Sequence, residues 1–422
     1  MSKNRKHEAA QASNAFQFTL AGLIVFSLAL IGGASFATYQ LTYQPRINPA
    51  DNFTVVDPND KNSAVHVGSW GALATRDLSL ERPAEFLTDE VTSPQPETWF
   101  FKGMNLAGVQ TFLAQNGIAT EHIKAALEPR NVTEKATGVE LRPPDDFLFA
   151  LSQSARQQLY GAMAGHAVNP YLDSPFVFPG GTINAIYTDS RLNPEDLAVL
   201  KRLVYANGTG HQLADYAALL GKIPTAQRRV AMAQALSRQS AVMARLVVNG
   251  KTDINKIADY WGHIPNVRFT DIRPLFDSLK ALPEGGSVSL IYLLPPFARN
   301  RLYTFPLPPQ PGEPVMDSHW TTFNFSNETP DNRFNDPAYT ISYINQNYYP
   351  IAAPSVYGDV LVLMNDRNEI KQSAVFLADD LVFTKNGNNY RQPWMIMHIP
   401  DLLAAYPASP ASRAVYLRRK SE

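Results

Sequence analysis

The stretch DSHWTTFNF, residues 317–325, places a serine beside a histidine, two side chains that can act together in catalysis. In such a pair the imidazole takes the proton of the hydroxyl while the oxygen attacks a carbonyl carbon. On a helix, however, neighbouring side chains point about 100° apart, so His319 is poorly placed to serve Ser318. Serine is a good helix N-cap, and Asp317 favours the same helix end. The residues alone therefore favour a capping role for Ser318.

The C-terminal part of the chain has an ordered set of segments around this stretch. DSHWTTFNF is followed by the predicted strand YGDVLVLM (357–364), and then by IKQSAVFLADDLVFTKNG (370–387), a strand that turns at an acidic pair and returns. PWMIM (393–397) is the next predicted strand. This order resembles the papain-like fold of the NlpC type, a superfamily of cell-wall amidases and endopeptidases. The resemblance covers about a quarter of the 422 residues.

The resemblance implies a cysteine nucleophile, a general-base histidine and a third, orienting polar residue. Ser318 stands at the position of the cysteine and Gln372 at that of the histidine, while the third position falls at Thr384, Lys385 or Asn386. A carboxamide cannot take a proton near neutral pH, so a Ser–Gln pair lacks a base. The resemblance therefore implies a pseudoenzyme, in which Ser318 and Gln372 face each other across a groove.

Other residues leave alternatives open. His319, Trp320 and His398 are candidates for lining the groove. A histidine nitrogen within hydrogen-bond reach of the Ser318 hydroxyl would indicate an active amide hydrolase instead. A purely structural envelope component without a ligand groove is the third interpretation. The eight histidines show no HExxH or HxH spacing, and the chain has no cysteine, so we predict neither a metal site nor a cofactor nor a disulfide.

The N-terminal region predicts a membrane segment. Residues 16–37 (FQFTLAGLIVFSLALIGGASFA) are apolar, and a helix needs roughly 20 residues to cross a bilayer. Lys3, Arg5 and Lys6 precede it, which predicts a single pass with the bulk of the chain on the extracytoplasmic side. The alternative is a signal peptide cleaved after Ala37, followed by secretion. The formal net charge of −1 does not indicate a nucleic-acid partner.

The elements that position these residues suggest an α+β protein in four parts, without an evident internal repeat. We predict a basic tail with a transmembrane helix or signal (1–44), a proline-rich stalk with a few short strands (45–95), a mainly helical middle domain (96–283), and a papain-like antiparallel sheet with a packed helix (284–422). The predicted function is that of a membrane-anchored binding or scaffolding module in the cell envelope. Its expected partner is a cell-wall peptide or an envelope protein.

Overall fold

The protein is described by a computed structural model. It describes residues 64–420 except 88–90, 164–166, 169–174, 209, 263–268, 308–312, 314–315, 366–368, 388–389 and 407–412. Within this part the predicted α+β class is confirmed, with helices and antiparallel sheets. The apolar segment 16–37 lies outside the described residues. None of the helices in the described part has the length and apolar character that a membrane crossing requires.

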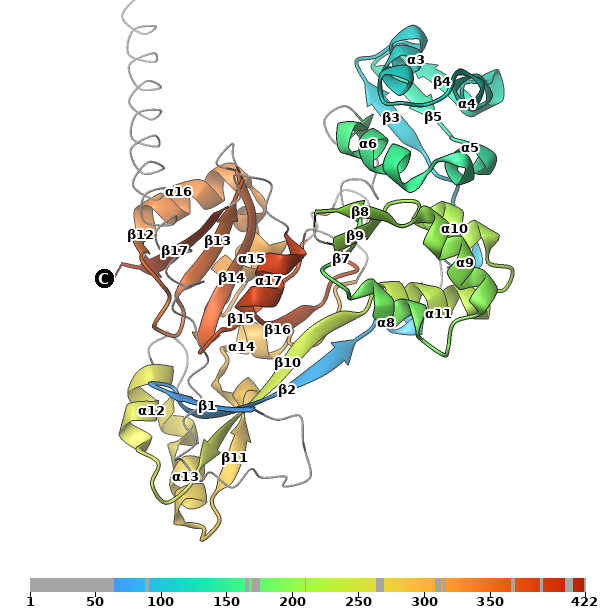
Figure 1. Cartoon of the computed structure of the whole chain (residues 1–422). Coiled ribbons are helices and arrows are strands. Elements are labelled where there is room, and N and C mark those ends of the chain that lie inside the picture. The colour runs from blue at the N-terminus through green and yellow to red at the C-terminus, as the bar shows by residue number, and fades with distance from the viewer. Residues whose placement is uncertain are drawn as a thin grey trace, which may run out of the picture.

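A four-stranded antiparallel sheet joins segments that are far apart in the sequence (Figure 1). Its strand order is β1 (Ala64–Gly68), β2 (Gly71–Leu80), β10 (Gln239–Val248) and β11 (Gly286–Ser289). The helices α12 (Ile254–Trp261) and α13 (Phe269–Ala281) lie between β10 and β11 in the chain and pack against this sheet. We call the sheet and these two helices the platform.

The platform corrects two predicted boundaries. The short strands expected in the stalk are present as β1 and β2, but they belong to the platform sheet rather than to a stalk. Local patterns could not show this, because the partner β10 lies more than a hundred residues downstream. The predicted boundary between residues 283 and 284 falls inside the platform, since β10 pairs with β11 across it.

The segment between β2 and β10 contains two units with the same order of elements (Figure 1). Repeat 1 consists of β3 (Trp99–Lys102), α3 (Leu106–Gln115), α4 (Thr120–Ala126), β4 (Val132–Lys135), β5 (Gly138–Leu141), α5 (Asp145–Ala150) and α6 (Gln153–Met163). Repeat 2 consists of β7 (Phe176–Phe178), α8 (Ile183–Tyr187), α9 (Pro194–Leu203), β8 (Tyr205–Asn207), β9 (Gly210–Leu213), α10 (Tyr216–Lys222) and α11 (Ala226–Leu236). The third strand lies between the other two in both sheets, and all pairs are antiparallel.

The two repeats share chemistry at matching positions. A Cβ on Gly138 would lie 2.2 Å from the carbonyl oxygen of Phe101, and one on Gly210 would lie 2.6 Å from that of Phe178. Both glycines thus let the middle strand approach the first strand closely. The sequence shows no evident internal repeat, whereas the structure has two units with the same order of elements. The middle segment is also less helical than predicted, since it contains the short strands β3 to β9. These strands were not predicted because each has too few residues to show an alternating pattern.

The repeats differ in their last strand. In repeat 1 the chain after α6 forms β6 (Ala167–Val168), which pairs with β3 of the same repeat. In repeat 2 the strand after α11 is β10, which leaves the repeat and pairs with β2 in the platform. The long strands β2 and β10 therefore connect the platform to the repeats (Figure 1).

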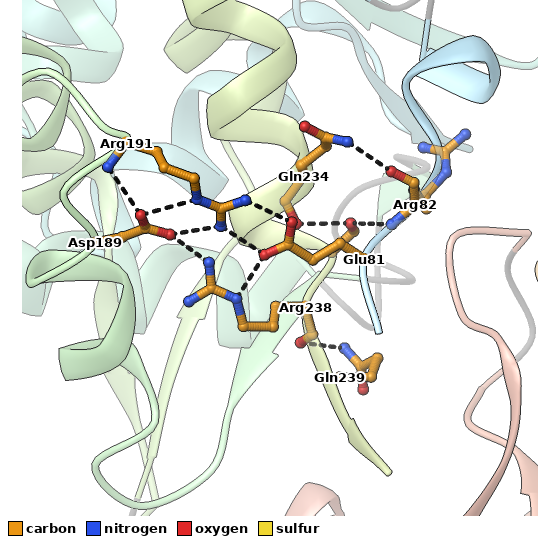
Figure 2. A network of polar contacts seen from close by, with 8 residues as sticks. Glu81, Arg82, Asp189, Arg191, Gln234, Arg238 and Gln239 are labelled. Carbon is orange, nitrogen blue, oxygen red and sulfur yellow. Dashed lines mark hydrogen bonds and ion pairs between the residues drawn. The ribbon is translucent and has the colours of Figure 1, made fainter. Parts of the chain in front are cut away.

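The two points where the chain crosses between platform and repeats are held together by charged side chains (Figure 2). Glu81 directly follows β2 and Arg238 directly precedes β10, and the Arg238 Nε donates to Glu81 Oε1 at 2.8 Å. Arg191 of repeat 2 donates to both carboxylate oxygens of Glu81, at 2.9 and 2.7 Å. Asp189 accepts from both arginines. This network fixes repeat 2 on the platform at the base of the inserted segment.

The C-terminal part forms a six-stranded antiparallel sheet. Its order is β12 (Tyr348–Ile351), β17 (Arg413–Arg419), β13 (Val360–Met364), β14 (Ile370–Ala378), β15 (Leu381–Lys385) and β16 (Trp394–His398). The remaining helices are α14 (Pro296–Arg299), α15 (Ser318–Phe323), α16 (Pro337–Asn347) and α17 (Ile399–Ala405). Short 3₁₀ turns span Ala84–Leu87, Pro129–Asn131, Leu290–Leu293 and Asn332–Asn335.

Both faces of this sheet are covered. Val375 and Phe383 belong to a core on the α15 face that continues to Trp261 in the platform. Phe376 and Leu402 belong to a second core on the opposite face, where α17 packs. Every residue of β14 from the third onward is therefore buried, whichever face its side chain points to.

Candidate functional site

The tip of α15 is built by Asp317 and Ser318. The Asp317 side chain accepts from the backbone N–H of Trp320 at 2.7 Å and caps the helix. Ser318 is the first helical residue and only 2% exposed. The capping role predicted for Ser318 therefore belongs to Asp317, because the carboxylate one residue earlier reaches the free N–H group better.

Ser373 of β14 lies against Ser318. Its backbone N–H donates to Ser318 Oγ at 3.3 Å, and its hydroxyl lies 3.1 Å from the Ser318 carbonyl oxygen. Ser373 is 0% exposed. The two serines thus join α15 to the sheet.

His319 is also directed at Ser373. Its Nδ1 lies 3.0 Å from Ser373 Oγ, and burial lowers the pKa of the imidazole. The Ser373 hydroxyl has one proton and can donate it to only one partner. If it donates to the Ser318 carbonyl, it accepts from the N–H of the His319 ring; otherwise it donates to His319 Nδ1. In both arrangements the imidazole bonds to Ser373, and Ser318 Oγ has no ring nitrogen as a partner in the described part of the chain.

Gln372 lies on the other face of the sheet. It pairs with Leu363, which belongs to the core on the α17 side. Its Nε2 donates to Thr384 Oγ1 at 2.9 Å and to the Lys385 carbonyl at 3.1 Å, and its Oε1 accepts from the Tyr406 hydroxyl at 3.0 Å. The expected meeting of Ser318 and Gln372 across a groove is therefore wrong. Successive side chains of a strand alternate between faces, and it is the next residue that faces α15.

The candidates for the third position are also separated. Thr384 bonds to Gln372 on the α17 face. Lys385 pairs with Trp394, whose indole N–H donates to Thr321 of α15, so the lysine belongs to the α15 face. Asn386 is half-buried beyond the end of β15.

Lys385 is a buried amine at the α15 end of the sheet. It is 0% exposed, and its Nζ donates to the Gly387 carbonyl at 3.3 Å. Burial lowers its pKa to about 7, although the nearby charge of Asp317 acts in the opposite direction.

The three residues expected to line a groove are not brought together. Trp320 is 1% exposed and its indole N–H donates to Asn332. His398 lies at the opposite end of β16 from Trp394, and its Nδ1 is 2.8 Å from Asp380 in the turn between β14 and β15. His319 remains at the α15 tip, where it contacts Ser373.

Sequence reasoning missed Ser373, and the pattern around it explains why. In a sheet with one solvated face, alternating polar residues show which side chains point inward. The run from Gln372 to Ala378 is apolar after its first two residues, because cores cover both faces. No signal in the sequence distinguished the faces of Gln372 and Ser373.

Comparison with known proteins gives no match to a family model, a curated protein or a solved structure. Across the described ranges of residues 64–420, no group of three or more His, Asp or Glu side chains has the geometry to hold a metal ion.

Proposed function

We propose that this chain is a non-catalytic binding or scaffolding protein of the cell envelope, and that its C-terminal sheet, in which Ser373 and not Gln372 faces the α15 tip, has no hydrolase chemistry. One observation carries this proposal: within the described residues, the Ser318 hydroxyl meets the Ser373 backbone N–H and no base. A serine hydroxyl needs a positioned base to become a nucleophile. In the same proposal, residues 16–37 anchor the protein with its bulk on the extracytoplasmic side.

Burial supports the same conclusion. A substrate carbonyl must come within about 3–3.5 Å of a nucleophilic oxygen before it reacts. Ser318 is 2% exposed and Ser373 0%, and their polar groups bond to each other across the helix–sheet contact. These hydrogen bonds stabilise the packing of α15 on β14, which is what a rigid scaffold requires.

A second candidate function is favoured by a different contact. The distance of 3.0 Å between Ser373 Oγ and His319 Nδ1 lies within the range of a nucleophile–base pair. An amide hydrolase would then use Ser373 as the nucleophile, rather than Ser318 as predicted from the sequence. The complete burial of Ser373 weighs against this candidate.

The test uses the full-length protein in detergent with cell-wall muropeptides. We expect no peptide release above that of a blank, and saturable binding in equilibrium dialysis. Variants Ser318→Ala and Ser373→Ala are compared with Ser342→Ala on the exposed surface of α16. Hydrolysis that only the Ser318→Ala or Ser373→Ala change abolishes would contradict the proposal. Absence of both hydrolysis and binding would leave the purely structural interpretation instead.

A further inference from the structure

Arg301 lies over a box of buried aromatic rings next to α15. Its guanidinium carbon is 4.0 Å from the ring centre of Phe297, 5.2 Å from that of Trp320 and 5.8 Å from that of Trp394. The three rings are at most 5% exposed, whereas Arg301 is half-buried. The rings therefore hold the guanidinium of a half-buried arginine in place.

The charge of Arg301 has no acidic partner in the described part of the chain. The guanidinium donates one hydrogen bond, from Nη1 to the Phe297 carbonyl at 3.1 Å. Burial lowers the pKa of Arg301, and no neighbouring carboxylate in the described ranges raises it. Arg418, in contrast, donates to both carboxylate oxygens of Asp359 at 2.8 Å.

Packing a charged side chain against buried aromatic rings costs desolvation free energy. Desolvating a guanidinium without a counter-charge disfavours the charged form, and an apolar side chain would cover the same rings without that cost. Arginine suits the position if a bound partner supplies a hydrogen-bond acceptor for its remaining N–H groups. A planar guanidinium that is already fixed in orientation loses little freedom when it binds a carboxylate by two parallel hydrogen bonds.

We infer that Arg301 is an anchor for a carboxylate of the bound partner, held in place by Phe297, Trp320 and Trp394. This inference rests on the proposed binding function and names a site for it. A carboxylate matches the site better than a phosphate does. A phosphate carries nearly two negative charges, whereas the Arg301 guanidinium is a single fixed cation with no second one bonded beside it in the described residues.

The position also links the anchor to the α15 end of the sheet. Trp320 belongs to α15, and Trp394 pairs with Lys385 at the end of β15 that adjoins α15. Arg301 is half-buried, whereas Ser318 is 2% exposed. A ligand bound there would not need access to the buried serines.

The experiment titrates the full-length protein in detergent with N-acetyl-alanyl-alanine and with its C-terminal amide, and follows indole fluorescence. We expect saturable binding of the free acid with a dissociation constant in the millimolar range, and binding of the amide about tenfold weaker. Arg301→Gln should weaken binding of the acid about tenfold, and Arg301→Lys should weaken it less because the charge remains. Arg299→Gln, a change in the exposed neighbouring arginine, is the matched control and should bind like the wild type. Thermal unfolding of each variant verifies that it is folded.

Equal binding of acid and amide, wild-type binding by a folded Arg301→Gln variant, or no saturable binding of the acid would each overturn the anchor. Inorganic phosphate in place of the peptide is a further arm. Tighter binding of phosphate than of the peptide acid, lost in Arg301→Gln, would overturn the assignment to a carboxylate. A separate measurement of muropeptide binding by Arg301→Gln tells the two proposals apart. Binding that persists in this variant would overturn the anchor but leave the proposed binding function intact, with its contact site elsewhere.

Discussion

Arg156 of repeat 1 and Asp215 of repeat 2 form an ion pair between the two repeats, with Nε and Oδ2 2.7 Å apart and both side chains at most 1% exposed. The Tyr160 hydroxyl donates to the other carboxylate oxygen, and the guanidinium also donates to the carbonyls of Leu148 and Arg202. Both carboxylate oxygens of Asp215 thus accept a hydrogen bond from repeat 1. This buried pair connects repeat 1 to repeat 2.

Breaking that pair should destabilise the repeats. Asp215→Asn leaves the guanidinium of Arg156 buried without its counter-charge, so we expect the free energy of unfolding to fall by about 3–5 kcal/mol. Glu195→Gln is the control, because Glu195 pairs with Arg228 at the surface, where such a change costs about 0–1 kcal/mol. The measurement is urea unfolding of the full-length protein. Equal shifts for the two variants would show that the buried pair does not hold the repeats together.

Two histidine–aspartate pairs meet at the turn between β14 and β15, and the first of them joins the platform to the six-stranded sheet. His66 of β1 bonds to Asp379, and His398 bonds to Asp380 in the same turn, each at 2.8 Å. Hydrogen bonds to the aspartates raise the pKa of both imidazoles, while burial and, for His66, the charge of His398 oppose this. Asp77 and Asp401 also face His398 and favour its charged form.

The sign of the resulting pH dependence follows from the raised pKa values. The stabilisation is fully present below the unfolded-state pKa of about 6.5 and is lost as pH rises through the higher folded-state values. The double variant His66→Gln, His398→Gln should therefore lose about 1–2 kcal/mol relative to the wild type near pH 5.5, and less near pH 9. Urea unfolding at both pH values measures this. A difference that grows with pH would contradict the account of this contact.

Lys385 should show the opposite trend. Its pKa is lowered from 10.5 to about 7 in the folded protein, so the unfolded chain binds more protons between these values, and stability rises with pH across that window. Lys385→Met removes the cost of burying the amine and should raise the free energy of unfolding near pH 7 by about 1–4 kcal/mol. The gain should shrink towards pH 10. A variant less stable than the wild type throughout would show that the amine stabilises the fold through its partners.

The N-terminal segment gives a prediction independent of the fold. If residues 16–37 form an anchor, the full-length protein stays with the membrane fraction after an alkaline carbonate wash, and a chain without residues 1–44 is released. Mass spectrometry of the protein from the membrane fraction should find the segment intact. A mature chain that begins after Ala37 would support the cleaved signal peptide instead.

Local patterns predicted those parts of the fold that depend on local physics. The strands β13 to β16 and the helix α17 followed from apolar runs and turn residues, and the structure places them at those segments. The platform could not be predicted in this way. The hairpin of β1 and β2 pairs with β10, and both repeats lie between these segments in the sequence. The repeats escaped notice because their shared signals are single residues, such as Gly138 and Gly210.

The candidate site depended on which residues of β14 face α15, and the sequence does not specify this. Ser318 was placed correctly at the start of a helix, but the residue facing it is Ser373 and not Gln372. A shift of one residue changes the face of every side chain in a strand. Because apolar cores cover both faces of β14, both registers fit the hydrophobic pattern equally well.

The central claim, that no serine at the α15 tip is an activated nucleophile, is tested most directly by a serine-reactive fluorophosphonate. The reagent phosphonylates activated serine hydroxyls without requiring knowledge of the substrate. Intact-mass measurement of the full-length protein should show no adduct under conditions that label a serine protease completely in the same tube. An adduct on Ser318 or Ser373 that is lost in the corresponding alanine variant, and in His319→Ala, would contradict the account.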